Sequence, residues 1–439
     1  MSIETKNLYD GYATQGDSLD GFNSAIAEMD AITRCRKIGK GDDIVVYALC
    51  EIPSIQVEDE VALFEFTRDS LESFEMEGKR LTVRHFSKEK LFGSTEEAAY
   101  LEEEFERTGL IISINMEKYI VSELCLQTLL QRCAVSGEMT FNRQNFYRNA
   151  HLADALFARG EYIMMVYREV GGIKKAFAAL TTGYQYVPQE LLCQIFDTIR
   201  KEGILGYADV KHWLMDQNFT NLYVEFPDMQ EDFLSMSKGM VEGVIPGIVL
   251  MTSDTGSCSV ICRSTFRKEG SKYYVILDEI AKKHTKGLCK EDVLTAVNDQ
   301  IFANIRRLPE TLAMLSGYPV LDYDTVDITT ASGRIENLNT VRDLYSSCIM
   351  DVLKDTGKLG KSRCVELLTQ LSDEINPSTK YSMLDVALTF MDIMDRVDGL
   401  DNVTKVTAQK ACAKVPFYLE KNLGKKKKKE EGSLVLLPA

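Results

Sequence analysis

The sequence predicts an α+β protein with a mixed, largely antiparallel β core, flanking helices and a helical C-terminal region. Two observations lead to this fold class. The middle of the chain carries apolar, strand-like runs separated by short glycine-containing turns. After Gly287 the pattern changes to apolar residues at helical spacing. The chain has 439 residues, too many for one ordinary core, so we expect one large domain and a smaller one.

The N-terminal quarter divides into a polar arm and an acidic segment. Residues 1–35 are predicted to be a flexible arm. Residues 36–110 are predicted to be an acidic α/β segment, which contains the strand-like run "DDIVVYALCEIPSIQV". The acidic block at 96–107 predicts an exposed helix in the same segment. Whether this segment is a separate domain stays open.

Residues 111–287 are predicted to form an α+β core with hairpins. The run "GLIISIN" predicts a short strand, and residues 117–137 carry apolar residues at helical spacing up to a stop at Gly137. Two strand-like runs then flank Gly171-Gly172, a strong hairpin signal. A helix is predicted at 189–203, after Pro188.

The second half of the core predicts more strands. "TNLYVEFPD" is one, and a long strand from Pro246 enters the turn Asp254-Thr255-Gly256, which a return strand leaves. The run "KYYVILDEI" fits either a strand or the start of a helix. Residues 288–423 are predicted to be helical, and the Lys-rich tail at 424–439 is predicted to be disordered.

Composition indicates a cytoplasmic protein. Eleven cysteines lack framework spacing, which is typical of reduced thiols. No apolar run approaches the roughly 20 residues that span a bilayer, and the polar N-terminus lacks the order of a signal peptide, so no membrane association is expected. The net charge of −15 argues against a simple nucleic-acid coat but leaves room for local basic patches.

The Asp254-Thr255-Gly256 turn has the letters of an aspartic protease turn but not its setting. Such a protease needs two turns whose carboxylates share one proton. The second copy, Asp355-Thr356-Gly357, follows a helical run, and polar Thr252 and Ser253 precede the first. A plain hairpin, with Gly256 supplying the unusual backbone angle, explains the turn better.

Other chemical motifs are absent or incomplete. Gly360-Lys361-Ser362 has Asp355 where a phosphate-binding loop needs glycine. The four histidines are isolated, so we expect no metal, and nothing in the sequence calls for a cofactor. A hidden catalytic site remains an alternative, since neighbouring strands would bring Ser253, Asp254, Thr255 and His284 together.

Aromatic residues interleave with basic ones on two predicted hairpins. One is "YREVGGIKKAFAALTTGYQYV" and the other is "CRSTFRKEGSKYY". Cations beside stacking aromatics are what a single nucleic-acid strand requires, although an ordinary amphipathic sheet gives the same pattern. The candidate nucleic-acid-binding residues are Arg168, Lys174, Lys175, Tyr184, Tyr186, Arg263, Phe266, Arg267, Lys268, Lys272, Tyr273, Lys282, Lys283 and His284.

Four stretches together resemble a phage and plasmid protein family, domain of unknown function 932. "REVGGIKKAFAALTTGYQYVPQELL" is similar to its basic strand, Ser-x-x-Tyr element and following helix, with Thr182 in place of Ser and Tyr186 as the Tyr. The turn Ser253-Asp254-Thr255-Gly256 matches the family's Asn-Ser-Glu-Thr-Gly at three positions.

The other two matches lie nearer the C-terminus. "KKHTKG" is similar to a basic-His-x-Gly stretch, with His284 and Gly287, and "YSMLDVALTFMDIMDRV" is similar to a late helical segment. "YVILDEI" replaces the family's Cys-x-Asn-Gly element. The resemblance covers roughly residues 115–415 and implies a gene carried on a phage, prophage or plasmid, hence a bacterial cytoplasm, but no established reaction.

These observations leave three functions to weigh. The first is a non-enzymatic single-stranded DNA-binding or annealing protein in replication or recombination, acting as a homo-oligomer. The second is a phage structural, host-interaction or anti-defence protein that meets a partner protein through an acidic face. The third is an enzyme with the hidden site around Ser253 and His284.

Overall fold

The computed structural model confirms an α+β fold with two mostly antiparallel sheets. It describes residues 5–71, 81–94, 98–137, 144–159, 162–202, 206–231, 243–270 and 274–284, and a few short stretches after residue 290. Most of the predicted C-terminal helical region and the whole Lys-rich tail lie outside the described residues. Within that region the structure describes two short antiparallel pairs, β15 (Pro319–Val320) with β18 (Tyr381–Ser382) and β16 (Val326–Thr329) with β17 (Ile335–Leu338).

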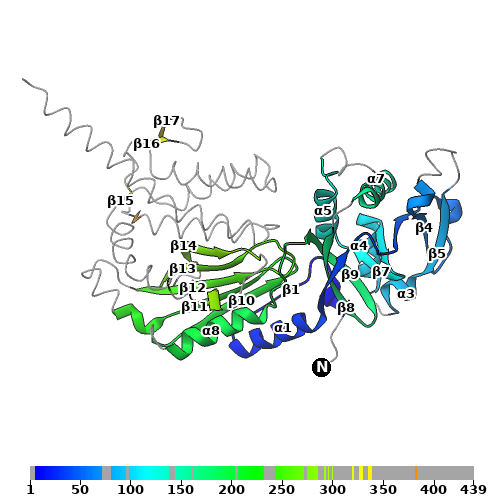
Figure 1. Ribbon diagram of the computed structural model, residues 1–439. Coiled ribbons are helices and arrows are strands. Elements are labelled where there is room, and N and C mark those ends of the chain that lie inside the picture. Colours follow the sequence, from blue (N-terminus) through cyan, green and yellow to red (C-terminus); the bar gives the residue numbers. More distant parts are fainter. Residues whose placement is uncertain are drawn as a thin grey trace, which may run out of the picture.

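The first sheet has six strands in the order β1-β10-β11-β12-β13-β14, and every neighbouring pair is antiparallel. The strands are β1 (Ala13–Gly16), β10 (Asp209–Asp216), β11 (Thr220–Glu225), β12 (Val244–Thr252), β13 (Val260–Lys268) and β14 (Val275–Lys282). Helices α1 (Leu19–Ile32) and α8 (Glu190–Glu202) lie side by side across one face of this sheet (Figure 1). Phe22, Ile195 and Phe196 fill that interface and are almost fully buried.

The second sheet has eight strands in the order β2-β8-β9-β7-β6-β3-β4-β5. The strands are β2 (Thr33–Ile38), β3 (Ile44–Leu49), β4 (Glu60–Phe66), β5 (Thr82–Ser87), β6 (Leu110–Ile114), β7 (Glu117–Val121), β8 (Ile163–Val170) and β9 (Ile173–Thr181). Strands β7 and β9 pair in parallel, and the other neighbours are antiparallel.

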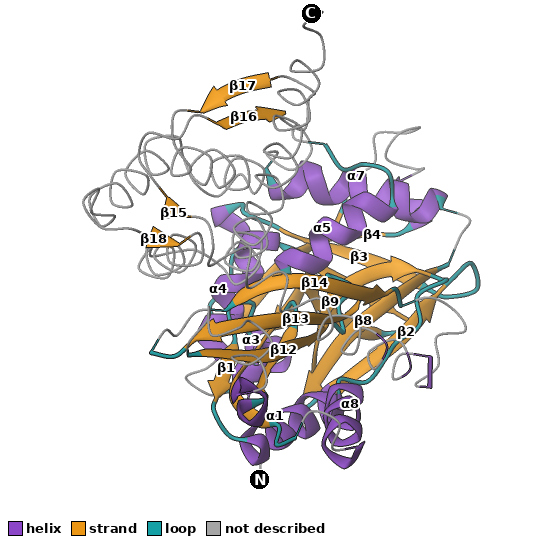
Figure 2. Cartoon of the chain, turned by 90° about the vertical axis from the view of Figure 1, so that its left-hand side faces the viewer, coloured by secondary structure: helices purple, strands orange, loops and turns teal. Residues whose placement is uncertain are grey.

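Helices cover both faces of the second sheet, which is why its central strands are apolar on both sides. Helices α5 (Glu123–Arg132) and α7 (Asn145–Ala158) pack on one face (Figure 2). Helices α3 (Lys88–Phe92) and α4 (Ala98–Thr108) pack on the other. All five residues of β6 are buried.

The expectation of a flexible arm at residues 1–35 is wrong for residues 5–35, the part that the structure describes. Strand β1 joins the first sheet and β2 joins the second, so this segment ties the two sheets together. Ser18 caps α1 through the Gly21 amide, 3.2 Å from Ser18 Oγ. Its carbonyl also accepts a 3.0 Å hydrogen bond from Trp213 Nε1. The order comes from contacts with residues nearly 200 positions away, which local periodicity does not reveal.

Two further expectations need correction. Residues 117–121 are strand β7, and the helix after them ends at Arg132 rather than near Gly137. The question left open for residues 36–110 is narrowed by the pairing of β3 with β6, which places strands of this segment and of the core in one sheet. The exposed acidic helix is amphipathic, and its Leu101 and Phe105 are buried. Of the two readings of "KYYVILDEI", the strand is confirmed as β14.

No described helix combines the length and the apolar character that a membrane span requires.

Candidate functional site

The Asp254 turn, which joins β12 to β13, is a joint between the two sheets. Ser253, Asp254 and Thr255 are all buried. Ser253 Oγ accepts hydrogen bonds from the amides of Thr255, at 3.2 Å, and Ser257, at 3.0 Å, which fixes the turn. Gly256 has φ +75°, and a Cβ there would lie 2.7 Å from Leu180 Cδ2 on β9. Glycine is needed both for the backbone angle and for the close approach of the second sheet.

A buried ion pair holds this joint. Arg168 Nη2, on β8, lies 3.0 Å from Asp254 Oδ2, and the two side chains are 0% and 1% exposed. The guanidinium also lies over the Phe177 ring, 4.4 Å from its centroid. Each charge is neutralised by the other within the protein, so neither is presented to solvent.

Tyr184 and His284 complete the joint. Their rings stack with centroids 5.2 Å apart and an interplanar angle of 7°. Tyr184 Oη donates toward the carbonyls of Ser253 and Asp254, 3.2 Å from each. Burial raises the pKa of the Tyr184 hydroxyl and lowers the pKa of His284, so both are neutral near pH 7.

This geometry does not assemble the proposed Ser–His pair. His284 Nε2 lies 3.5 Å from Thr252 Oγ1, whereas Ser253 Oγ is engaged by Thr255 and by the amides of its own turn. The residues of the hypothetical catalytic site are neighbours, as expected from the sequence, but their contacts are those of a packed joint.

The other predicted binding residues are also mostly engaged inside the protein. Lys175 is 1% exposed and lies between Asp10 and Glu104, at 2.7 and 2.6 Å. Arg267 forms a two-pronged ion pair with Glu225, with N–O distances of 2.5 and 3.0 Å. The expectation of two exposed basic hairpins is therefore wrong for these cations, because each had an acidic partner far along the chain.

The remaining predicted residues differ in exposure. Tyr186 Oη donates to Asp30 Oδ1 at 3.2 Å, and Lys174 Nζ lies 2.7 Å from Glu117 Oε1. Arg263 and Phe266 are buried. Lys282 is half-buried and Lys283 is exposed. The Lys268 side chain, Lys272 and Tyr273 lie outside the described residues.

A basic strand that the sequence-based prediction missed lies at the edge of the second sheet. Strand β2 pairs with β8 and, among the described strands, has no neighbour on its other side. It carries Arg34, Arg36 and Lys37, and Lys40 follows in the next turn. Arg34, Lys37 and Lys40 are exposed, and within the described structure none of them lies within ion-pair distance of a carboxylate. Arg36 is paired with Glu117 at 2.5 Å.

An exposed aromatic ring accompanies these cations. Tyr162 is 49% exposed, and Lys37 Nζ lies 4.4 Å from its ring centroid. A Cβ on Gly39 would overlap the Tyr162 ring, so the glycine allows the ring to lie against the end of β2. The edge thus offers an exposed aromatic ring beside exposed positive charge.

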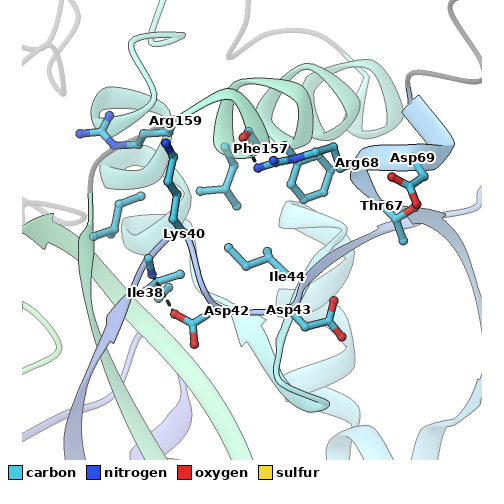
Figure 3. Close-up of a pocket in the computed structure, with 13 residues that line it drawn as sticks. Ile38, Lys40, Asp42, Asp43, Ile44, Thr67, Arg68, Asp69, Phe157 and Arg159 are labelled. Atoms are coloured by element: carbon cyan, nitrogen blue, oxygen red, sulfur yellow. Dashed lines mark hydrogen bonds between the residues drawn. The ribbon is translucent and has the colours of Figure 1, made fainter.

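A cavity of about 300 Å³ opens at the same end of β2. Figure 3 shows it between the β2–β3 turn, the Thr67–Asp69 segment and the end of α7. Lys40 and Arg159 lie on one side of it, and Asp43 and Asp69 on the other. Asp42 is engaged, because its Oδ2 accepts from the Gly39 amide and its Oδ1 from Asn115 Nδ2, both at 2.8 Å.

The segment "TRCRKIGK" held the available signal for this site, with four cations in eight residues. The predicted arm boundary at residue 35 divided it.

Among the described residues, no group of three His, Cys, Asp or Glu side chains has the spacing of a metal site. Burial raises the pKa of Cys35 on the same strand to about 12, so this thiol is no activated nucleophile.

Comparison with known proteins adds no assignment: no family model, no curated protein and no solved structure matches this chain. The resemblance to domain of unknown function 932 therefore stays a prediction.

Proposed function

We propose that this protein is a non-enzymatic, single-stranded DNA-binding protein whose contact surface is the edge strand β2. The observation that carries the proposal is the set of exposed cations along this edge, Arg34, Lys37 and Lys40, with Lys37 beside the exposed ring of Tyr162. Arg34 and Lys37 extend from opposite faces of the strand, and Arg34 Nη1 also donates to the Thr33 carbonyl at 2.8 Å. Cations that lack an internal acid remain available to phosphates, and an exposed ring remains available to a base. The β2 edge takes the place of the two hairpins that were predicted from the sequence to be the DNA-binding surface.

The arrangement favours a single strand over a duplex. The six residues of β2 span about 20 Å, so the basic edge of the sheet is long and narrow. Stacking on Tyr162 requires a base whose face is free, and duplex bases are stacked on each other. The overall charge of −15 opposes binding at a distance, so we expect a modest affinity that depends strongly on salt.

Charged edge strands also have a purely structural use, because lysine and arginine discourage edge-to-edge association of sheets. The two roles predict different behaviour for variants that lack these cations. If the cations only protect the edge, their removal promotes self-association and leaves DNA affinity unchanged. If they bind DNA, their removal weakens binding of a protein whose mass is unchanged.

The alternative of an acidic partner surface has less support. On α4, Glu102 pairs with Lys88 at 2.6 Å, Glu103 with Arg107 at 3.1 Å and Glu104 with buried Lys175. These carboxylates are neutralised locally, so the helix does not present a continuous negative face. The phage or plasmid setting rests on the sequence resemblance, and annealing activity and homo-oligomeric assembly are expectations that accompany the single-strand-binding hypothesis.

The test is the affinity of the full chain for a fluorescent single-stranded 12-mer and for its duplex, with the mass measured in parallel. The Arg34→Ala/Lys37→Ala variant is compared with Arg200→Ala/Lys201→Ala on α8, which removes the same charge from exposed sites elsewhere. We expect wild type and the α8 variant to prefer the single strand, and the β2 variant to bind at least tenfold more weakly. Equal affinities for the two variants would refute the β2 surface.

A further inference from the structure

The cavity beside β2 is lined by apolar side chains and by charged side chains of both signs. The apolar residues are Ile38, Ile44, Leu156, Phe157 and Ile163, while polar atoms make up the larger part of its accessible surface. At about 300 Å³ the cavity has the size of a small-molecule site rather than of a packing defect. Residues 38–40, at the end of β2, line the cavity (Figure 3), so we expect a strand held along β2 to reach it.

The charges on the rim are separated across the cavity. One of the hydrogen-bond donors of Arg68 is already engaged, since its Nη2 donates to the Phe157 carbonyl at 2.7 Å. Lys40 on one side, and the carboxylates of Asp43 and Asp69 on the other, make no ion pair or side-chain hydrogen bond within the described structure. A ligand that satisfies this rim has an anionic end, an apolar flat body and a hydrogen-bond donor at the opposite end.

We propose that this cavity binds one nucleotide of the bound strand and selects bases that carry an exocyclic amino group. The phosphate contacts Lys40, the base contacts the apolar lining residues, and its amino group donates to the carboxylate of Asp43. Cytosine, adenine and guanine each present such a donor, whereas thymine has no exocyclic amino group and presents a carbonyl oxygen where cytosine has its amino group, which a carboxylate repels. This inference rests on the proposed function, and it adds a base preference that β2 alone does not supply.

Base preference tests the cavity separately from strand binding. Fluorescent dC 12-mers and dT 12-mers are titrated against the full chain at one salt concentration. We expect wild type to bind the dC strand about tenfold more tightly, the lower part of the range for a base-specific contact. In Asp43→Asn the ratio should fall to about one, because a carboxamide both accepts from cytosine and donates to thymine.

The matched control is Asp20→Asn, an exposed acid on α1. Both substitutions remove one negative charge, which strengthens binding of the dC and dT strands alike, so only a change in the dC to dT ratio, expected for Asp43→Asn and not for Asp20→Asn, reports on the cavity. Equal wild-type affinities for dC and dT, with binding still dependent on Arg34 and Lys37, overturn the cavity proposal and leave the proposed function standing. Failure to bind either strand overturns both.

Discussion

Arg168 Nη2 lies 3.0 Å from Asp254 Oδ2, and this buried pair connects the second sheet to the turn between β12 and β13 of the first. The turn has the letters of a catalytic motif. Its aspartate instead neutralises an arginine 86 positions earlier in the chain. The pair explains how an arginine and an aspartate can both be buried at this position.

Breaking this pair from one side should destabilise the protein strongly. Asp254→Asn leaves a buried guanidinium without its counter-charge, and we expect a loss of about 3–5 kcal/mol in the free energy of unfolding. Replacing both partners, as in Arg168→Met/Asp254→Leu, should recover much of that loss because no charge remains buried. Urea denaturation measures both.

An exposed pair provides the control for this prediction. Glu103→Gln removes a carboxylate that lies 3.1 Å from Arg107 on the surface of α4, and it should cost less than about 1 kcal/mol. An Asp254→Asn variant as stable as Glu103→Gln would show that the joint does not depend on the ion pair.

Lys175 should be as sensitive as Arg168. Its removal in Lys175→Met leaves Asp10 and Glu104 together without a cation, and we expect about 3–5 kcal/mol of destabilisation in urea. The neighbouring Lys174→Met removes a cation whose partner, Glu117, is 46% exposed, so it should cost far less. Similar losses for the two variants would contradict the assigned burial.

Acidification should weaken the joint through His284. Burial lowers the folded-state pKa of this imidazole below its usual 6.5, so below about pH 6.5 the unfolded chain binds more protons than the folded one. The free energy of unfolding therefore falls as the pH falls from 7 toward 5. His284→Phe retains a ring to stack on Tyr184 and should flatten this dependence.

His212, whose pKa is lowered in the same direction by burial, keeps its own share of the pH dependence in that variant. Urea unfolding at pH 7.0 and 5.5 gives the comparison. A slope in His284→Phe as steep as in wild type would mean that the imidazole is already solvated in the folded protein.

Tyr162 should contribute to DNA binding through its ring. We expect Tyr162→Ala to weaken binding of the single-stranded 12-mer roughly five- to 150-fold, the usual loss of 1–3 kcal/mol for one stacked base. Tyr162→Phe should retain most of the affinity, and Tyr207→Ala, an exposed tyrosine next to the first sheet, should leave it unchanged. Fluorescence anisotropy at constant salt ranks the three, and equal losses for Tyr162→Ala and Tyr207→Ala would exclude stacking at this site.

Local sequence was sufficient to predict the tight turns and the strands beside them, because these features depend on residues that are neighbours along the chain. Gly171 and Gly172 have φ values of +59° and +85°, as a tight hairpin between β8 and β9 requires, and the turn at Gly256 follows the same logic. The α+β class follows from such turns and from the apolar runs between them.

What the sequence could not supply was the pairing of charges across the fold. Lys175 reads as a surface cation until Glu104, 71 positions away, is brought beside it. Arg34 and Lys37 belong to an edge strand whose side chains alternate poorly in polarity, so the period-two signal was weak. Tertiary contacts thus decide which of the basic residues remain exposed to solvent.

The most direct test of the account is the salt dependence of single-strand binding by the Arg34→Ala/Lys37→Ala variant and by wild type. Each phosphate contact contributes about 0.7 to the slope of log affinity against log salt for a single strand, so the loss of two contacts should reduce that slope by about 1.4. The Arg200→Ala/Lys201→Ala control should keep the wild-type slope. An unchanged slope in the β2 variant would contradict the assignment of the edge strand as the DNA-binding surface.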